Sequence, residues 1–197
     1  MTKRIAGIIS LIANPFLLIV PVPYLLVYRV TYDNIYALYW TAVSIIFLII
    51  VGLFIIYAVK KGVFSDFDVS HREQRSLLFI TIGIASILYL VVLVIGHGPQ
   101  VLYLAILGFL LSIIAIAVIN TRIKASIHTA TITALIVLFW FLYDMNLVLI
   151  LFVPLVAWSR ITVNRHTISE VVAGSIIGGG LTLFLYLLVR IALKLFV

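Results

Sequence analysis

Long apolar runs separated by short polar segments fill the chain from one end to the other. The apolar runs cover residues of approximately 5–28, 37–59, 77–95, 101–119, 128–143, 147–158 and 168–194. A helix that crosses a bilayer needs about 20 mostly apolar residues. The pattern therefore predicts an all-α polytopic integral membrane helical bundle, with about six to seven transmembrane helices in a single transmembrane domain over residues 1–197.

The first run is interrupted by Pro15, Pro21 and Pro23, so we expect it to be kinked or partly irregular. Its start, Lys3-Arg4 before apolar residues, imitates a signal peptide. Because no small-residue cleavage site precedes Pro15, we expect a retained span. Aromatic residues typical of a membrane interface surround the polar break at 31–34: Tyr24, Tyr28, Tyr32, Tyr36, Tyr39 and Trp40.

Two features near the carboxyl-terminal end leave alternatives open. The sixth run is short, and we expect Pro154 to break its helix. In the last run Gly174 and Gly178 are one helical turn apart. This spacing permits close contact with another helix, or the glycines are simply tolerated in lipid without a packing role.

Composition excludes a soluble protein. The 197 residues are 65% hydrophobic and 10% charged, with a mean hydropathy of +1.36, whereas soluble domains are about 45–50% apolar. The absence of cysteine excludes disulfides and thiolate metal sites. The net charge is +7, and the basic residues lie at the ends of apolar runs, where they can contact lipid head groups. Because this explains the charge, we expect no nucleic-acid partner.

The polar segments 60–76, 120–128 and 159–170 are each separated by a helical hairpin, so they are expected to emerge on one face of the membrane. Ten of the thirteen basic residues share this face: Lys3, Arg4, Lys60, Lys61, Arg72, Arg75, Arg122, Lys124, Arg160 and Arg165. Only Arg29, Arg190 and Lys194 fall opposite. The positive-inside rule makes the shared face cytoplasmic, in what we expect to be the cell membrane.

The segment 159–170 carries candidate chemistry. His166 and Glu170 are four residues apart and lie on one face of a helix, where the carboxylate can orient the imidazole. Arg160 supplies a guanidinium suited to phosphate or carboxylate. These residues favour an anion-handling site at the membrane interface, or else a loop whose charges only mark the water boundary.

Three sequence patterns resemble the signatures of the type 2 phosphatidic acid phosphatase superfamily. Ser159-Arg160, His166 and Glu170 resemble its third signature, SRxxxxxHxxxD. Ser126-Ile127-His128 looks like the second signature, PSGH, and Arg75 stands where the first, KxxxxxxRP, has its arginine. The resemblance covers residues of approximately 65–175, and the third signature is its specific part.

The resemblance implies a membrane lipid phosphatase that needs no metal and no cofactor and acts on lipid phosphates or polyprenyl diphosphates. His166 would be the nucleophile, Glu170 would orient it, and His128 would protonate the leaving oxygen. The phosphate-binding residues would be Arg75, Ser126 and Arg160. The phosphatase-like core would span about residues 60–194, and phosphoryl transfer, which depends on positioning and charge stabilisation, suits such residues.

The chain departs from the family pattern at several positions, most of all in the first signature. The departures are Asp68 for lysine, Ser76 for proline, Ala125 for proline, Ile127 for glycine and Glu170 for aspartate. Lys124, beside Ser126, either replaces the missing ammonium in binding phosphate or reaches a lipid head group. Asp66 and Asp68 either mark a metal-bound diphosphate or form structural ion pairs.

The expected function is therefore hydrolysis of a lipid phosphate or polyprenyl diphosphate through a phosphohistidine intermediate. A non-catalytic relative that binds or transports a lipid phosphate is the alternative. A channel or transporter unrelated to phosphate would place charges in the middle of its helices, where this chain is almost entirely apolar. Oligomeric state, lipid tail and head group stay open.

Overall fold

A computed structural model describes residues 1–145 and 147–195, and the secondary structure of these residues is wholly helical. Five segments are long and apolar enough to cross a membrane: Thr2–Ile19, Asn34–Lys60, Arg75–Ile95, Gln100–Asn120 and Ile168–Ile191. Two shorter apolar helices, Ile127–Tyr143 and Val148–Thr162, accompany them. The all-α class predicted from the apolar pattern is confirmed, and the long apolar helices indicate a membrane protein.

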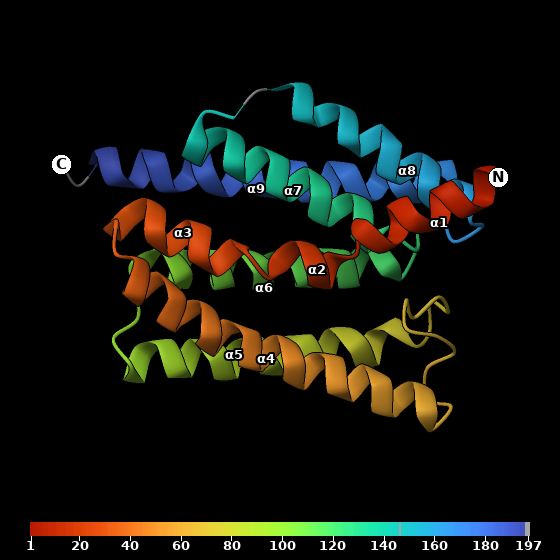
Figure 1. Ribbon diagram of the computed structural model, residues 1–197, viewed down its shortest axis with the longest axis horizontal. Coiled ribbons are helices and arrows are strands. Elements are labelled where there is room, and N and C mark those ends of the chain that lie inside the picture. Colours follow the sequence, from red (N-terminus) through yellow and green to blue (C-terminus); the bar gives the residue numbers. More distant parts are fainter. Residues whose placement is uncertain (146, 196–197) are drawn as a thin grey trace. The chain divides into compact units, whose positions relative to one another are not determined.

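The described residues form two compact units. The first unit comprises Met1–Leu18 together with the chain from Thr121 onward, and the second comprises Ile19–Asn120. The first unit therefore joins segments from both ends of the sequence. Figure 1 shows the helices of each unit in sequence colours.

Proline divides the first apolar run into three helices, as expected: α1 (Thr2–Ile12), α2 (Pro15–Ile19) and α3 (Val22–Thr31). Asn14 lies between α1 and α2 and stabilises the start of α2, because its side-chain oxygen accepts a hydrogen bond of 2.9 Å from the Phe16 amide. Pro21 is the N-cap of α3 and Pro23 lies in its first turn, where a missing amide hydrogen costs no helical bond.

The first unit also contains α7 (Ile127–Tyr143), a 3₁₀ helix η1 (Leu147–Leu151), α8 (Phe152–Thr162) and α9 (Ile168–Leu195). Helix α9 packs most extensively on α7, and α8 packs on α1 as well as on α7 and α9. The helix break expected at Pro154 does not occur. Pro154 occupies the first turn of α8, where proline fits, so the helix continues to Thr162. Ser159 and Arg160 consequently belong to a helix rather than to a loop.

The second unit contains α3, α4 (Asn34–Lys60), α5 (Arg75–Ile95) and α6 (Gln100–Asn120). Helix α4 packs on α3 and α5, and α6 packs on α5 and α3. The α3–α4 turn is fixed by Asp33, the N-cap of α4, whose carboxylate accepts a 3.0 Å bond from the Tyr36 amide. The turn follows Tyr32, which takes the left-handed conformation that ends α3.

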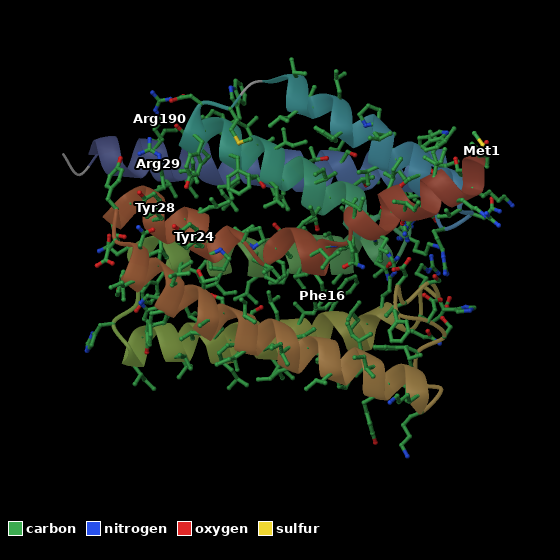
Figure 2. All side chains as sticks on the ribbon, in the orientation of Figure 1. Met1, Phe16, Tyr24, Tyr28, Arg29 and Arg190 are labelled. Atoms are coloured by element: carbon green, nitrogen blue, oxygen red, sulfur yellow. The ribbon has the colours of Figure 1, made fainter. Side chains whose placement is uncertain are left out.

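The predicted aromatic belt gathers around this turn. The rings of Tyr24 and Tyr28 stack with centroids 5.7 Å apart, and both are visible on α3 in Figure 2. The Tyr24 hydroxyl lies 2.7 Å from the Asn34 side-chain oxygen, and Arg29 donates to the Tyr32 hydroxyl at 2.9 Å. Aromatic rings with polar tips suit the head-group region of a bilayer.

Candidate active site

A histidine–carboxylate pair lies in the first unit at the start of α9. The Nδ1 atom of His166 is 2.8 Å from Glu170 Oε2, as the spacing of four residues predicts. Glu170 belongs to the first turn of α9 and also accepts a 3.2 Å bond from the Thr167 amide. In the tautomer with the ring hydrogen on Nδ1, directed at the carboxylate, Nε2 carries the lone pair that a base or a nucleophile uses.

The turn between α8 and α9 carries His166 back over the end of α8. Asn164 has the left-handed backbone conformation, φ 57°, that commonly ends a helix. The amides of Arg165 and His166 then both donate to the Arg160 carbonyl, at 3.0 and 3.3 Å. This turn is why an arginine and a histidine six positions apart belong to one small region.

The Arg160 side chain is 3% exposed and lies in the last turn of α8. Its Nη1 donates to the hydroxyl of Ser10, which comes from α1, 150 residues earlier in the sequence. Ser10 is buried with Ala6 and Ala13 on one face of α1. These three small side chains, spaced i, i+4 and i+7, let α1 approach α8 closely.

The second signature segment contacts the third. Ser126 is the N-cap of α7, and its hydroxyl accepts from the Thr129 amide at 3.4 Å. The Ser126 amide donates to the Glu170 carbonyl at 3.0 Å, and the Thr129 hydroxyl donates to the Val171 carbonyl at 3.0 Å. His128, 6% exposed, lies in the same first turn of α7.

The glycines of α9 permit this contact. A Cβ atom on Gly174 would overlap the Ser126 carbonyl and the Thr129 hydroxyl, and one on Gly178 would overlap the Ala130 backbone. Close helix contact is therefore the correct interpretation of the Gly174/Gly178 spacing. Because the contacts advance in the same direction along both helices, α7 and α9 run parallel and begin side by side. Their amino-terminal amides provide partial positive charge at the site.

Lys124 is half-buried just before α7, and its ammonium donates to the Arg165 carbonyl at 2.9 Å. The bond ties the segment before Ser126 to the turn before His166. Lys124 thus has a structural contact in the site, and its contact with a lipid head group stays a prediction. Its contact with phosphate likewise stays a prediction.

Arg75, the predicted ligand from the first signature, belongs to the second unit. It is the first residue of α5, it is buried, and its Nε donates to the Val69 carbonyl at 3.1 Å. Its participation in the site stays a prediction. In the same segment Asp66 accepts from the Asp68 amide at 2.9 Å and from the Ser70 hydroxyl at 3.0 Å. These bonds favour a structural role for Asp66.

Among the residues that the structure describes, no group of three or more His, Asp or Glu side chains is arranged to hold a metal ion. The predicted site residues of the first unit, which are His128, His166, Arg160, Lys124 and Glu170, supply two imidazoles, a guanidinium, an ammonium and one carboxylate. With neutral imidazoles, the two cations and one anion leave the region with net positive charge. Such a region favours a bound anion.

Sequence reasoning missed Ser10 and Thr129. Ser10 is a single hydroxyl within an apolar run, and only its spacing from Ala6 and Ala13 could have indicated a buried face. Thr129 follows the second signature directly. Its hydroxyl also lies within donor distance of the Ser126 carbonyl, at 3.2 Å. Both residues position site residues rather than supply reactive groups.

Comparison with protein-family models, with curated proteins and with solved structures finds no match to this chain.

Proposed function

We propose that the protein is a membrane phosphatase that hydrolyses a lipid phosphate or polyprenyl diphosphate through a phosphohistidine. The observation that carries the proposal is the His166–Glu170 pair at 2.8 Å, with buried His128 on the helix packed against α9. Buried Arg160 lies six residues before His166, and its carbonyl accepts from the His166 amide. A histidine oriented by a carboxylate is suited to nucleophilic attack, and an adjacent guanidinium is suited to phosphate oxygens.

In the first step the Nε2 atom of His166 attacks phosphorus and the bond from phosphorus to the leaving oxygen breaks. Glu170 holds the ring through Nδ1 and stabilises the positive charge that develops on it. His128 donates a proton to the leaving oxygen. The leaving group is then the lipid alcohol or, when the substrate is a diphosphate, the singly protonated lipid monophosphate.

In the second step water attacks the phosphohistidine, the P–N bond breaks and inorganic phosphate leaves. His128, now deprotonated, takes the proton from this water and returns to its starting state. Arg160 and the amino-terminal amides of α7 and α9 stabilise the phosphate charge in both steps. Ser10 holds the Arg160 guanidinium in place.

The site belongs at a membrane surface in this proposal. The two shorter apolar helices, α7 and α8, would join the five long segments to give six to seven crossings. The excess of Lys and Arg on the segments around 60–76, 120–128 and 159–170 favours a cytoplasmic site in the cell membrane. A lipid substrate could then keep its tail in the bilayer while its phosphate reaches His166.

The test is release of phosphate by the purified full chain in detergent from phosphatidate, phosphatidylglycerophosphate and prenyl diphosphates. We expect turnover of at least one substrate, unchanged by EDTA. His166→Ala should lower it by at least about 10²-fold to 10⁴-fold, the range for removal of a catalytic proton-transfer or nucleophilic group. His71→Ala is the matched control, because His71 is exposed and lies in the second unit.

Acid-labile phosphate on the wild-type chain, absent from His166→Ala, would identify the intermediate. Turnover that survives in His166→Ala would overturn the mechanism. Turnover that EDTA abolishes would instead require a metal.

A non-catalytic protein that binds a lipid phosphate is the second candidate. One observation favours it: Asp68 replaces the family lysine, and the ammonium of Lys124 is bonded to the Arg165 carbonyl. This candidate predicts saturable binding of lipid phosphate vesicles that Arg160→Ala weakens, with no phosphate release from any of the substrates above.

A further inference from the structure

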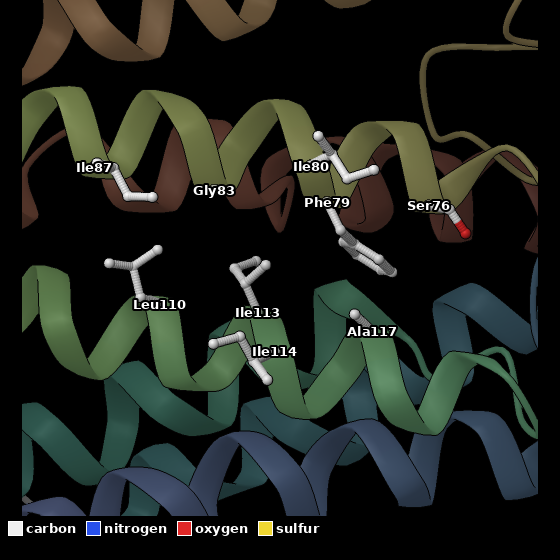
Figure 3. Close-up of a pocket in the computed structure, with 9 residues that line it drawn as sticks. All are labelled: Ser76, Phe79, Ile80, Gly83, Ile87, Leu110, Ile113, Ile114 and Ala117. Atoms are coloured by element: carbon white, nitrogen blue, oxygen red, sulfur yellow. The ribbon is translucent and has the colours of Figure 1, made fainter.

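A groove of about 370 Å³ lies between α5 and α6 in the second unit. Figure 3 shows the side chains that line it, which face one another across the two helices. On α5 the lining follows one helical face through Ser76, Gly83 and Ile87, and on α6 it runs from Ala117 to Leu110. Apart from the Ser76 hydroxyl, the lining side chains are apolar.

Small residues are the cause of this groove. A Cβ atom added to Gly83 would meet no atom within 4 Å, so the space beside Gly83 is open. On α6, the small side chain of Ala117 also lines the groove. The groove also opens outward, because the side chains of Ile80 and Ile114 on its walls are 59% and 58% exposed.

The position and length of the groove along the two helices indicate which kind of molecule it can hold. It begins at Ser76, the second residue of α5 and the last residue of the polar segment 60–76, and it ends at Ile87, near the middle of that helix. On α6 it likewise runs from Ala117, near the polar end, to Leu110 at the centre. At 1.5 Å per residue the α5 wall is about 16 Å long, whereas the hydrocarbon core of one leaflet is about 15 Å thick.

A helix of a second copy that packed along the whole membrane span would contact about 30 Å of its partner, and this groove covers about half of that length. A hydrocarbon chain anchored by its head group at the membrane surface occupies one leaflet only, and this groove has that extent. It also has the polarity of such a chain's surroundings, with a hydroxyl at the surface end and branched apolar side chains below. Contact with two helices at once gives a chain more dispersion attraction than contact with one.

We propose that this groove is a binding site for one hydrocarbon chain of a membrane phospholipid, with the lipid head group beside Ser76. The site is separate from the proposed phosphatase chemistry, because its lining residues all belong to the second unit and none is a predicted catalytic residue. It holds a resident lipid whether or not the protein hydrolyses phosphate.

The test uses the full chain in nanodiscs that contain a phosphatidylethanolamine with a diazirine on one acyl chain, followed by peptide mapping after illumination. We expect labelling concentrated on 76–87 and 110–117. Gly83→Leu fills the groove and should reduce this labelling to the level of other lipid-facing helix surfaces. Gly52→Leu on α4 is the matched control, since a Cβ on Gly52 also meets no atom within 4 Å, and it should leave the labelling unchanged.

Ala117→Leu fills the groove from the opposite wall and should repeat the effect, which guards against a folding defect particular to one variant. Labelling spread evenly over the lipid-facing surfaces, or labelling that both groove-filling variants leave unchanged, would overturn the proposal in favour of ordinary surrounding lipid. Cross-links between copies at these residues would overturn it in favour of a second chain. These outcomes do not depend on any phosphatase assay.

Discussion

Two helix pairs use glycine in opposite ways. Between α7 and α9, Gly174 and Gly178 meet the backbone of the other helix, and no side chain fits between the two. Between α5 and α6, Gly83 faces open space and contributes to a groove. The first pair brings Ser126 and Glu170 into direct backbone contact, whereas the second keeps a space that extends over half the span.

The difference shows that a glycine in an apolar helix indicates nothing by itself about packing. All three glycines lie in helices that are long and apolar enough to cross a membrane. What separates them is the neighbour opposite: backbone at the α7–α9 contact, and nothing within 4 Å at Gly83. We call α7–α9 the closed pair and α5–α6 the open pair. The closed pair suits a site whose residues must keep a fixed geometry. The open pair suits a ligand without a fixed geometry, such as a hydrocarbon chain.

The largest expected effect tests the chemistry of the closed pair. Glu170→Gln keeps the size of the side chain but removes the charge that stabilises an imidazolium, so we expect phosphatase turnover to fall by about 10²-fold to 10⁴-fold. Glu170→Asp, which restores the family residue, should retain most activity. Equal turnover in Glu170→Gln and the wild type would show that the His166–Glu170 pair is only structural.

The second effect concerns the packing of the closed pair. Gly178→Ala would place a methyl group against the Ala130 backbone, so we expect a loss of stability of about 1–3 kcal/mol, the usual cost of overpacking. Thermal unfolding in detergent measures it. Gly180→Ala on the same helix is the control, because a Cβ there meets nothing within 4 Å, and it should not destabilise. Equal effects of the two variants would contradict the close contact.

A smaller effect is expected where α1 meets α8. Ser10→Ala removes the hydroxyl bonded to Arg160, and loss of one hydrogen bond to a charged group predicts a fall of about tenfold in kcat/KM. Ser112→Ala on α6 is the matched control, since that hydroxyl bonds only to the Gly108 carbonyl of its own helix among the bonds found. A loss of stability without a change in kcat/KM would mean that Ser10 holds α1 and not Arg160.

The smallest effect belongs to the open pair. Gly83→Ala should raise stability by about 0.5–1 kcal/mol, because alanine favours the helix and its methyl group meets no neighbour. The sign is opposite to that expected for Gly178→Ala, and the same thermal unfolding experiment compares them. A destabilised Gly83→Ala would show that the two glycines are equivalent after all.

Local patterns in the sequence predicted those parts of the molecule that depend on neighbours along the chain. Helix periodicity was sufficient for the His166–Glu170 pair, and proline chemistry for the division of α1, α2 and α3. The extent of α8 was missed, because Pro154 was expected to break a helix whose first turn it in fact occupies. A proline's position within the helix decides this, and the apolar pattern does not reveal that position.

Contacts between distant segments were harder to predict. The contact between Ser126 and Glu170 follows the order of the family signatures, so the resemblance pointed to it. The bond from Arg160 to Ser10 crosses 150 residues and joins a signature arginine to a hydroxyl in an apolar run, for which no local pattern exists. The groove of α5 and α6 depends on which helix faces meet, and periodicity alone does not determine that choice. The place of Arg75 stays a prediction from the signature.

If the protein hydrolyses a lipid phosphate as proposed, the shared contacts of α7 and α9 also limit how that lipid enters and leaves. Two backbones that touch at Gly174 and Gly178, and are joined through the Thr129 hydroxyl, act as one stiff wall. Gating by separation of these helices would sacrifice several contacts at once. Helix α1 packs on α8, and its buried Ser10 accepts a hydrogen bond from Arg160. In the proposed phosphatase, we therefore expect product release to proceed without separation of α7 and α9.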